Sequence, residues 1–176
     1  MPERLIDVPL ESLPFIDEHS VAVAAPAEVV WDALVATLPS FTTARGGAKV
    51  ADLLDCTPAE RAGAPGRIGS TIPGFMVTRS IRPAVLALMG QHRFSCYALV
   101  FRISETPLGP VLLSAETRAE FPGRSGRYYR AAVIGTRGHV LATAGLLRAI
   151  RRRAERTVAR PERQLRRKVR TASTRR

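Results

Sequence analysis

The chain has 176 residues, of which 45% are hydrophobic and 24% charged, and these proportions exclude a wholly disordered protein. Its length suits one globular domain. The formal net charge is +12. Residues 148–176 contain 13 of the 27 basic residues and only 2 of the 15 acidic ones, so the body is close to neutral and the excess charge lies in a C-terminal extension.

The sequence favours a cytoplasmic location. Cys56 and Cys96 form no CxxC pair, and we expect both to be free thiols in a reducing compartment. The first residues include acids and prolines where a secretory signal needs an apolar run. The longest apolar stretch, residues 84–89, is far shorter than the roughly twenty residues of a membrane span.

The first elements are a leader, a strand and a helix. Residues 1–16 have the character of a loosely attached leader. From Asp17 to Ala24 the residues alternate, which predicts a half-buried strand with His19, Val21 and Val23 on one face. Pro26 suits the first turn of a helix, and Pro39 is expected to end it.

The middle of the chain has the period of strands. Alternation recurs in residues 75–82, 93–103 and 111–121, with a short apolar strand at 85–89, and the turns between them are short. This pattern predicts an antiparallel meander with one apolar face. Glu116, Arg118 and Glu120 share the opposite face with Arg102, which favours a charge ladder on the outside of the sheet over acid–base catalysis.

A long helix is predicted after Ser125, because apolar and small residues recur there at spacings of three and four over about seven turns. The seam consists of Tyr129, Val133, Thr136, Val140, Thr143, Leu147, Ile150 and Ala154. Residues 157–176 lose the pattern, and we expect a flexible basic tail there.

The order of elements predicts an α+β helix-grip fold, in which a curved antiparallel sheet wraps around the long C-terminal helix. The middle of the predicted helix has small side chains, at Gly135, Gly138, Ala142 and Gly145. Small residues there leave a cavity above the sheet, or they let helix and sheet backbones approach closely. Spacing alone does not decide between these two explanations.

Several segments resemble one superfamily. AVAAPAEVVWDAL (residues 22–34) is similar to the first strand and helix of the START-like, Bet v 1-like proteins, which include polyketide cyclases/dehydrases and lipid-transport proteins. GSTIPGFMV, GQHRFSCYALVFRI, SAETRAEFPG and GRYYRAAVIGTRGHV resemble an uncharacterised bacterial branch of that superfamily. The resemblance covers residues 17–156, and it implies a helix-grip domain with a deep pocket for an apolar small molecule. It carries no catalytic residue over, because the superfamily has no universal catalytic set.

Eleven residues are candidates for lining this pocket, because they fall on the apolar sides of the strands and along the helix seam. They are Phe75, Val77, Arg79, Tyr97, Phe101, Thr117, Tyr129, Thr136, His139, Val140 and Thr143.

Two of these residues carry alternatives. If the alternation along residues 75–82 is regular, Arg79 points inward with Phe75 and Val77, and an unpaired charge there needs an anionic ligand group or water. Otherwise it reaches solvent near the strand end, or a bulge reverses its parity. His139 is either a pocket base partnered by Tyr97 or a partly buried histidine satisfied by backbone. His19, His92 and His139 match no metal-ligand spacing, so neither a metal nor another cofactor is expected.

The leading hypothesis is that the protein binds or transports an apolar small molecule, such as a lipid or a polyketide, between the sheet and the C-terminal helix. An alternative is a cyclase or dehydratase acting in the same pocket. A third is an adaptor whose arginine-rich tail docks on anionic membrane or nucleic acid. The sequence fixes neither the ligand nor the oligomeric state.

Overall fold

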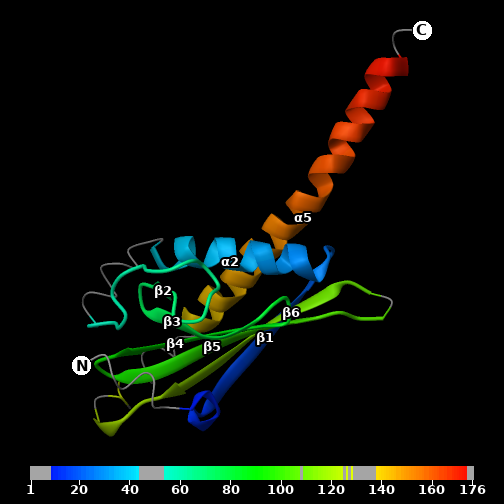
Figure 1. Cartoon of the computed structure of the whole chain (residues 1–176). Helices are drawn as coiled ribbons and strands as arrows, with labels where there is room; N and C mark the ends of the chain where they lie inside the picture. The colour runs from blue at the N-terminus through cyan, green and yellow to red at the C-terminus, as the bar shows by residue number, and fades with distance from the viewer. Residues whose placement is uncertain are drawn as a thin grey trace.

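The computed structural model of the chain describes residues 9–43, 54–107, 109–124, 126, 128 and 138–173, and for residues 41–43, 138–139 and 161–173 it describes the backbone alone. A single antiparallel sheet is covered on one face by two helices (Figure 1). This is the helix-grip arrangement that the order of elements predicted. In the described part of the chain, no helix is both long and apolar enough to cross a membrane.

The sheet has six strands in the order β1-β6-β5-β4-β3-β2. From β3 to β6 each strand pairs with the next, which confirms the predicted meander, and β1 adds to the free edge of β6. The strands are β1 (Phe15–Val23), β2 (Thr71–Ile72), β3 (Phe75–Ile81), β4 (Val85–His92), β5 (Ser95–Ser104) and β6 (Val111–Glu120).

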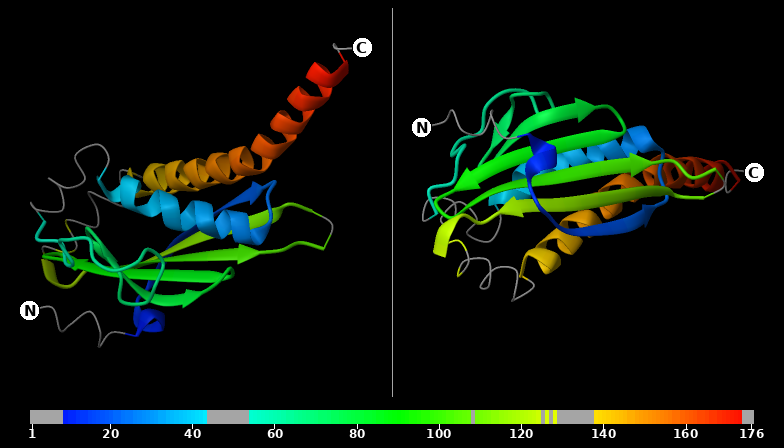
Figure 2. Two further views of the ribbon diagram at one scale, coloured as in Figure 1. Left: turned by 45° about the horizontal axis from the view of Figure 1, so that its top comes forward. Right: turned by 90° about the horizontal axis from the view of Figure 1, so that it is seen from below.

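Helices α2 (Ala27–Thr43) and α5 (Gly138–Ser173) lie on the same face of the sheet, here called the inner face (Figure 2). The main hydrophobic core lies between them and the sheet, and Val30, Leu34, Phe101, Leu113 and Ile150 are fully buried in it. Burying such side chains stabilises the fold by roughly 1.5–3 kcal/mol each.

The predicted end of α2 at Pro39 is wrong, because the helix continues to Thr43. Proline removes one backbone donor from a helix interior. In the same turn, the Ser40 hydroxyl donates to the carbonyl oxygen of Thr37 (2.9 Å) and adds a local bond.

Helix α5 packs its seam on the core and then projects beyond the sheet (Figures 1 and 2). Leu147, Ile150 and Ala154 are buried, as their spacing predicted. At the end of β1 the backbone N–H of Ala24 donates to Oε1 of Glu155 (3.3 Å). The backbone stays helical to Ser173, where the sequence pattern suggested a tail. Arginine, leucine and alanine, which occur repeatedly in this stretch, favour the helix.

The outer face of the sheet is covered in part by residues 9–14, which the sequence analysis assigned to a loose leader. The short 3-10 helix η1 (Leu10–Ser12) precedes Leu13, whose side chain is 1% exposed and contacts Met89 and Ala98. The carbonyl oxygen of Pro14 accepts a bond from the Ala119 backbone N–H (3.0 Å). Apolar contact and hydrogen bonds therefore fasten this segment to the sheet.

Candidate ligand-binding site on the inner face

Three polar side chains gather on the inner face, at the strands β1 and β6. Asp17 lies opposite Thr117 in the β1–β6 register, and His19 lies opposite Ala115. Residues directly opposite each other in an antiparallel pair point to the same face, and Ala115 belongs to the main core. The alternation of β1 therefore turns Asp17 and His19 toward the helices, together with Val21 and Val23.

The Asp17 and His19 side chains are in contact. Nε2 of His19 is 3.3 Å from Oδ2 of Asp17, and the two side chains are 30% and 20% exposed. An imidazole held by a carboxylate is fixed in orientation and can accept or donate a proton at its other nitrogen. The pair is partly shielded from water, so a ligand at the inner face would meet a polar group with a defined orientation.

The Thr117 hydroxyl adds a polar atom that lacks a partner. Its Oγ1 is buried and makes no hydrogen bond to the described residues. A buried hydroxyl without a partner costs about 1–3 kcal/mol. Its other cross-strand neighbour is Leu99, a half-buried side chain that packs against the core. Among the described residues, Thr117 therefore offers an unused donor and acceptor next to apolar surface.

Under the middle of α5, several side chains of the helix pack against the inner face. Leu146, Leu147 and Ile150 are buried against the sheet, and Thr143 is buried at the start of this region. A Cβ built on Gly145 would meet no atom within 4 Å, so a close approach of helix and sheet does not explain this glycine. A small cavity of about 20 Å³ lies beneath α2 and is lined by Val77 and Leu88 among others. It has room for about one water molecule.

Of the alternatives for Arg79, the structure shows the one in which a bulge turns the side chain away from the inner face. The register of β3 and β4 shifts between Val77 and Arg79, so that Val77 lies opposite Leu88 and Arg79 lies opposite Ala87. Leu88 is in the main core, whereas Ala87 is on the other face. The bulge therefore reverses the parity after Val77, and Arg79 is exposed on the outer side.

The other predicted residues on the sheet lie on the inner face. Val77 and Phe101 are buried, and Phe75 packs half-buried against the same core. The ring of Phe75 makes an edge contact with the ring of Tyr97 (5.2 Å between centroids). The Tyr97 hydroxyl donates to the carbonyl oxygen of Gly74 (2.9 Å), so it holds the β2–β3 turn in place.

The predicted residues of the C-terminal helix are described in part. Val140 is half-buried and Thr143 is buried, as the seam requires. Tyr129, Thr136 and the side chain of His139 lie outside the described residues. The hypothesis of a His139–Tyr97 pair is therefore not tested by the structure.

Sequence reasoning missed the pairing of Asp17 with His19. Parity had already placed His19 on the apolar side of its strand, and Asp17 is two positions earlier on the same strand. A carboxylate two residues before an inward histidine was the signal that could have identified the pair. Within the described ranges, no group of three or more His, Cys, Asp and Glu side chains is arranged to hold a metal ion.

The predicted charge ladder is present on the outer face. The Glu116 carboxylate accepts bonds from Nη1 of Arg102 (2.9 Å) and from Nε of Arg118. Arg118 also donates to the carbonyl oxygen of Leu13 (3.0 Å). These groups therefore join the sheet to residues 9–14 and lie on the face opposite to the Asp17–His19 pair.

Comparisons with known proteins give the fold. The structure is similar to that of an uncharacterised protein from Rhizobium leguminosarum, with 14% identity, 80% of this chain and 97% of that chain covered, and a TM-score of 0.51. It is similar to a Bacillus halodurans protein, with 18% identity, coverages of 81% and 98%, and a TM-score of 0.53. It is also similar to norcoclaurine synthase from Thalictrum flavum, with 13% identity, 77% of this chain and 94% of that chain covered, and a TM-score of 0.47.

No family model matches the sequence, and no curated protein matches it at a significant level. At identities this low, the structural likeness shows a shared fold only. The fold is a helix-grip arrangement, with a curved antiparallel sheet beneath a long C-terminal helix.

Proposed function

We propose that the protein is a START-like binding protein that holds a largely apolar small molecule, such as a lipid or a polyketide, at the inner face beside α5. Thr117 and the Asp17–His19 pair would receive a polar group of that molecule. The observation that carries the proposal is the buried Thr117 Oγ1, which has no hydrogen-bond partner within the described residues.

The surroundings of Thr117 support this proposal. A small-molecule site is mostly apolar with a few polar groups that fix orientation. Leu99 and Val21 lie on the same face of neighbouring strands, and both pack half-buried against the core. A ligand acceptor or donor at Oγ1 would remove the cost of burying this hydroxyl without a partner.

Native mass spectrometry of freshly purified protein tests the proposal directly. We expect an apolar molecule to copurify, or the protein to bind a fluorescent fatty acid added afterwards. Thr117→Val removes the hydroxyl at nearly constant shape, and we expect affinity to fall about fivefold, the equivalent of one hydrogen bond. Ser114→Ala is the control, since Ser114 is buried on the same strand but on the opposite face. If neither a copurified molecule nor bound fatty acid is found, the proposal is wrong.

A second candidate function, a lyase or cyclase that uses His19 as its base, rests on the Asp17–His19 contact. The test is to incubate the protein with the copurified molecule and follow its conversion. His19→Asn and Asp17→Asn would slow turnover far more than they weaken binding. A molecule recovered unchanged after long incubation with the native protein would exclude this candidate.

A further inference from the structure

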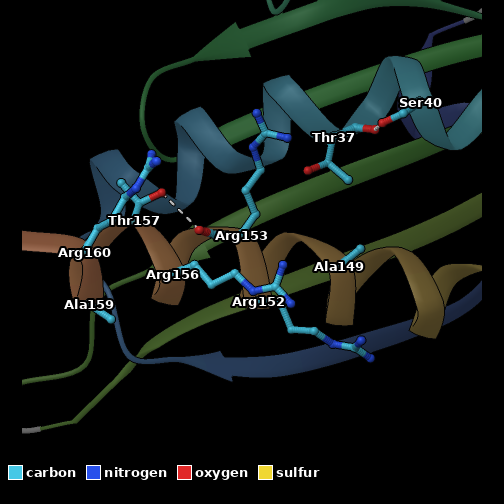
Figure 3. A pocket seen from close by; sticks show the side chains of 9 residues that line it. All are labelled: Thr37, Ser40, Ala149, Arg152, Arg153, Arg156, Thr157, Ala159 and Arg160. Carbon is cyan, nitrogen blue, oxygen red and sulfur yellow. Dashed lines mark hydrogen bonds between the residues drawn. The ribbon is translucent and has the colours of Figure 1, made fainter. Parts of the chain in front are cut away.

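A basic recess lies between α5 and the C-terminal half of α2, outside the inner face. Figure 3 shows it from close by. It encloses about 800 Å³, and Arg152, Arg153, Arg156 and Arg160 line it from α5. Thr37 and Ser40 of α2 form its opposite wall. In the figure the side chains of Arg153 and Arg160 extend from α5 toward α2.

These four guanidinium groups are here called the arginine stripe, and all four are exposed. None of the four forms an ion pair with a carboxylate in the described part of the chain. Their neighbour Arg151 differs, because it contacts Oε1 of Glu155 at 3.2 Å. Four positive charges that line one recess repel one another, and a bound anion relieves that repulsion.

The arginines are the available donors of the recess. The Thr37 hydroxyl already donates to the carbonyl oxygen of Ala33 (2.6 Å), and the Thr157 hydroxyl donates to that of Arg153 (3.0 Å). A guanidinium presents up to five N–H donors in a planar fork that matches phosphate oxygens. The recess is therefore suited to phosphate groups.

The stripe continues as a line of helix positions. At 3.6 residues per turn, positions 152, 156 and 160 lie on one side of α5, about 120–160° around the helix from Ala154, which is buried in the core, and position 153 lies about 100° from it. The same spacing places Arg163, Arg166, Arg167 and Arg170 on that side in sequence. With a rise of 1.5 Å per residue, the line from position 152 to position 170 is about 27 Å long.

We infer that the arginine stripe binds the phosphodiester backbone of nucleic acid. A line of cations matches a line of regularly spaced phosphates. A membrane fits less well, because the stripe begins in a recess that a flat surface does not enter, and the buried apolar seam of α5 points away from it. The lining includes no aromatic side chain that could stack on bases, so contact would be to the backbone and independent of base sequence.

The test uses the full chain and a fluorescently labelled 30-base-pair DNA duplex, with binding followed by anisotropy from 50 to 200 mM salt. Each phosphate contact contributes about 0.9 to the slope of log affinity against log salt. Replacing all four arginines by glutamine should therefore lower that slope by about three to four and weaken binding more than tenfold. Replacing them by lysine should retain most of the affinity, because the charges remain.

A matched control removes the same number of charges elsewhere. Arg61, Arg67, Arg79 and Arg124 are exposed and lie outside the stripe, and changing them to glutamine should leave duplex binding within about threefold. Equal loss in both quadruple variants would overturn the inference, because net charge alone would then explain binding. So would an absence of duplex binding accompanied by stripe-dependent binding to phosphatidylserine vesicles. Since all eight side chains are exposed, the variants should keep the native unfolding midpoint, which circular dichroism would verify.

Discussion

Tyr97 lies directly across from Gly90 in the β4–β5 pair, and its ring occupies the space that a side chain at position 90 would need. A Cβ on Gly90 would lie 2.7 Å from Cε2 of Tyr97 and would collide with the carbonyl oxygen of Gly74. The same carbonyl accepts the Tyr97 hydroxyl. Gly90 is thus required by the packing of a ring and a backbone turn, not by a left-handed conformation.

Gly90→Ala should lower the free energy of unfolding by about 3 kcal/mol, because an added methyl group in a filled space forces backbone shifts. Equilibrium urea unfolding measures this change. Gly145→Ala is the comparison, since its Cβ would meet no atom within 4 Å and alanine favours a helix. That variant should gain about 0.5–1 kcal/mol. Equal stability of the Gly90→Ala protein and the native protein would contradict this packing.

Glu116→Gln should destabilise the protein, because it weakens hydrogen bonds on the outer face of the sheet. The Glu116 side chain is 10% exposed and its carboxylate accepts bonds from Arg102 and Arg118. Losing two charge-assisted bonds at a nearly buried position should cost about 2 kcal/mol.

Glu120→Gln is the control for this change. Glu120 is an exposed acid on the same face of the same strand, and its replacement should alter the unfolding free energy by less than about 0.5 kcal/mol. If both variants lost similar unfolding free energy, the negative charge on this face, rather than the two bonds of Glu116, would be what stabilises the sheet.

The meander and the helix seam were predictable because their signals are local. The alternation in β6 and the spacing of Leu147, Ile150 and Ala154 report which side of each element is buried, and the structure buries those sides. Such periodicity depends only on the geometry of one strand or one helix. The inner and outer faces of β5 and β6 therefore followed from residues within each strand.

Arg79 was not predictable by the same reasoning. Its parity reverses because β3 gains a residue relative to β4 between Val77 and Arg79, and that shift is a property of the pair of strands. The Asp17–His19 contact has a similar origin. Parity places both side chains on one face, but their contact also depends on how β1 pairs with β6 after the shift between Phe15 and Asp17.

Leu13→Ala should show that residues 9–14 belong to the folded domain. Leu13 is 1% exposed against Met89 and Ala98, and truncating a buried leucine costs about 2–5 kcal/mol. For a protein of this size, thermal unfolding should shift down by roughly 4–15 °C. Leu112→Ala, at a position that is 40% exposed, should shift it much less. A Leu13→Ala protein with the native midpoint would show that the segment is detached in solution.

His92 should make stability fall as the pH decreases below about 6.5. Burial lowers the pKa of His92 from its ordinary value of 6.5, so below that pH the unfolded chain takes up a proton that the folded chain resists. Above pH 7 both states are neutral at this residue and it contributes no pH dependence. Nδ1 of His92 accepts the Phe94 backbone N–H (3.1 Å), and His92→Asn retains an acceptor that does not titrate. Urea unfolding at pH 7.5 and 5.5 should therefore show a smaller loss of stability for His92→Asn than for the native protein. Identical losses would mean that His92 titrates alike in both states.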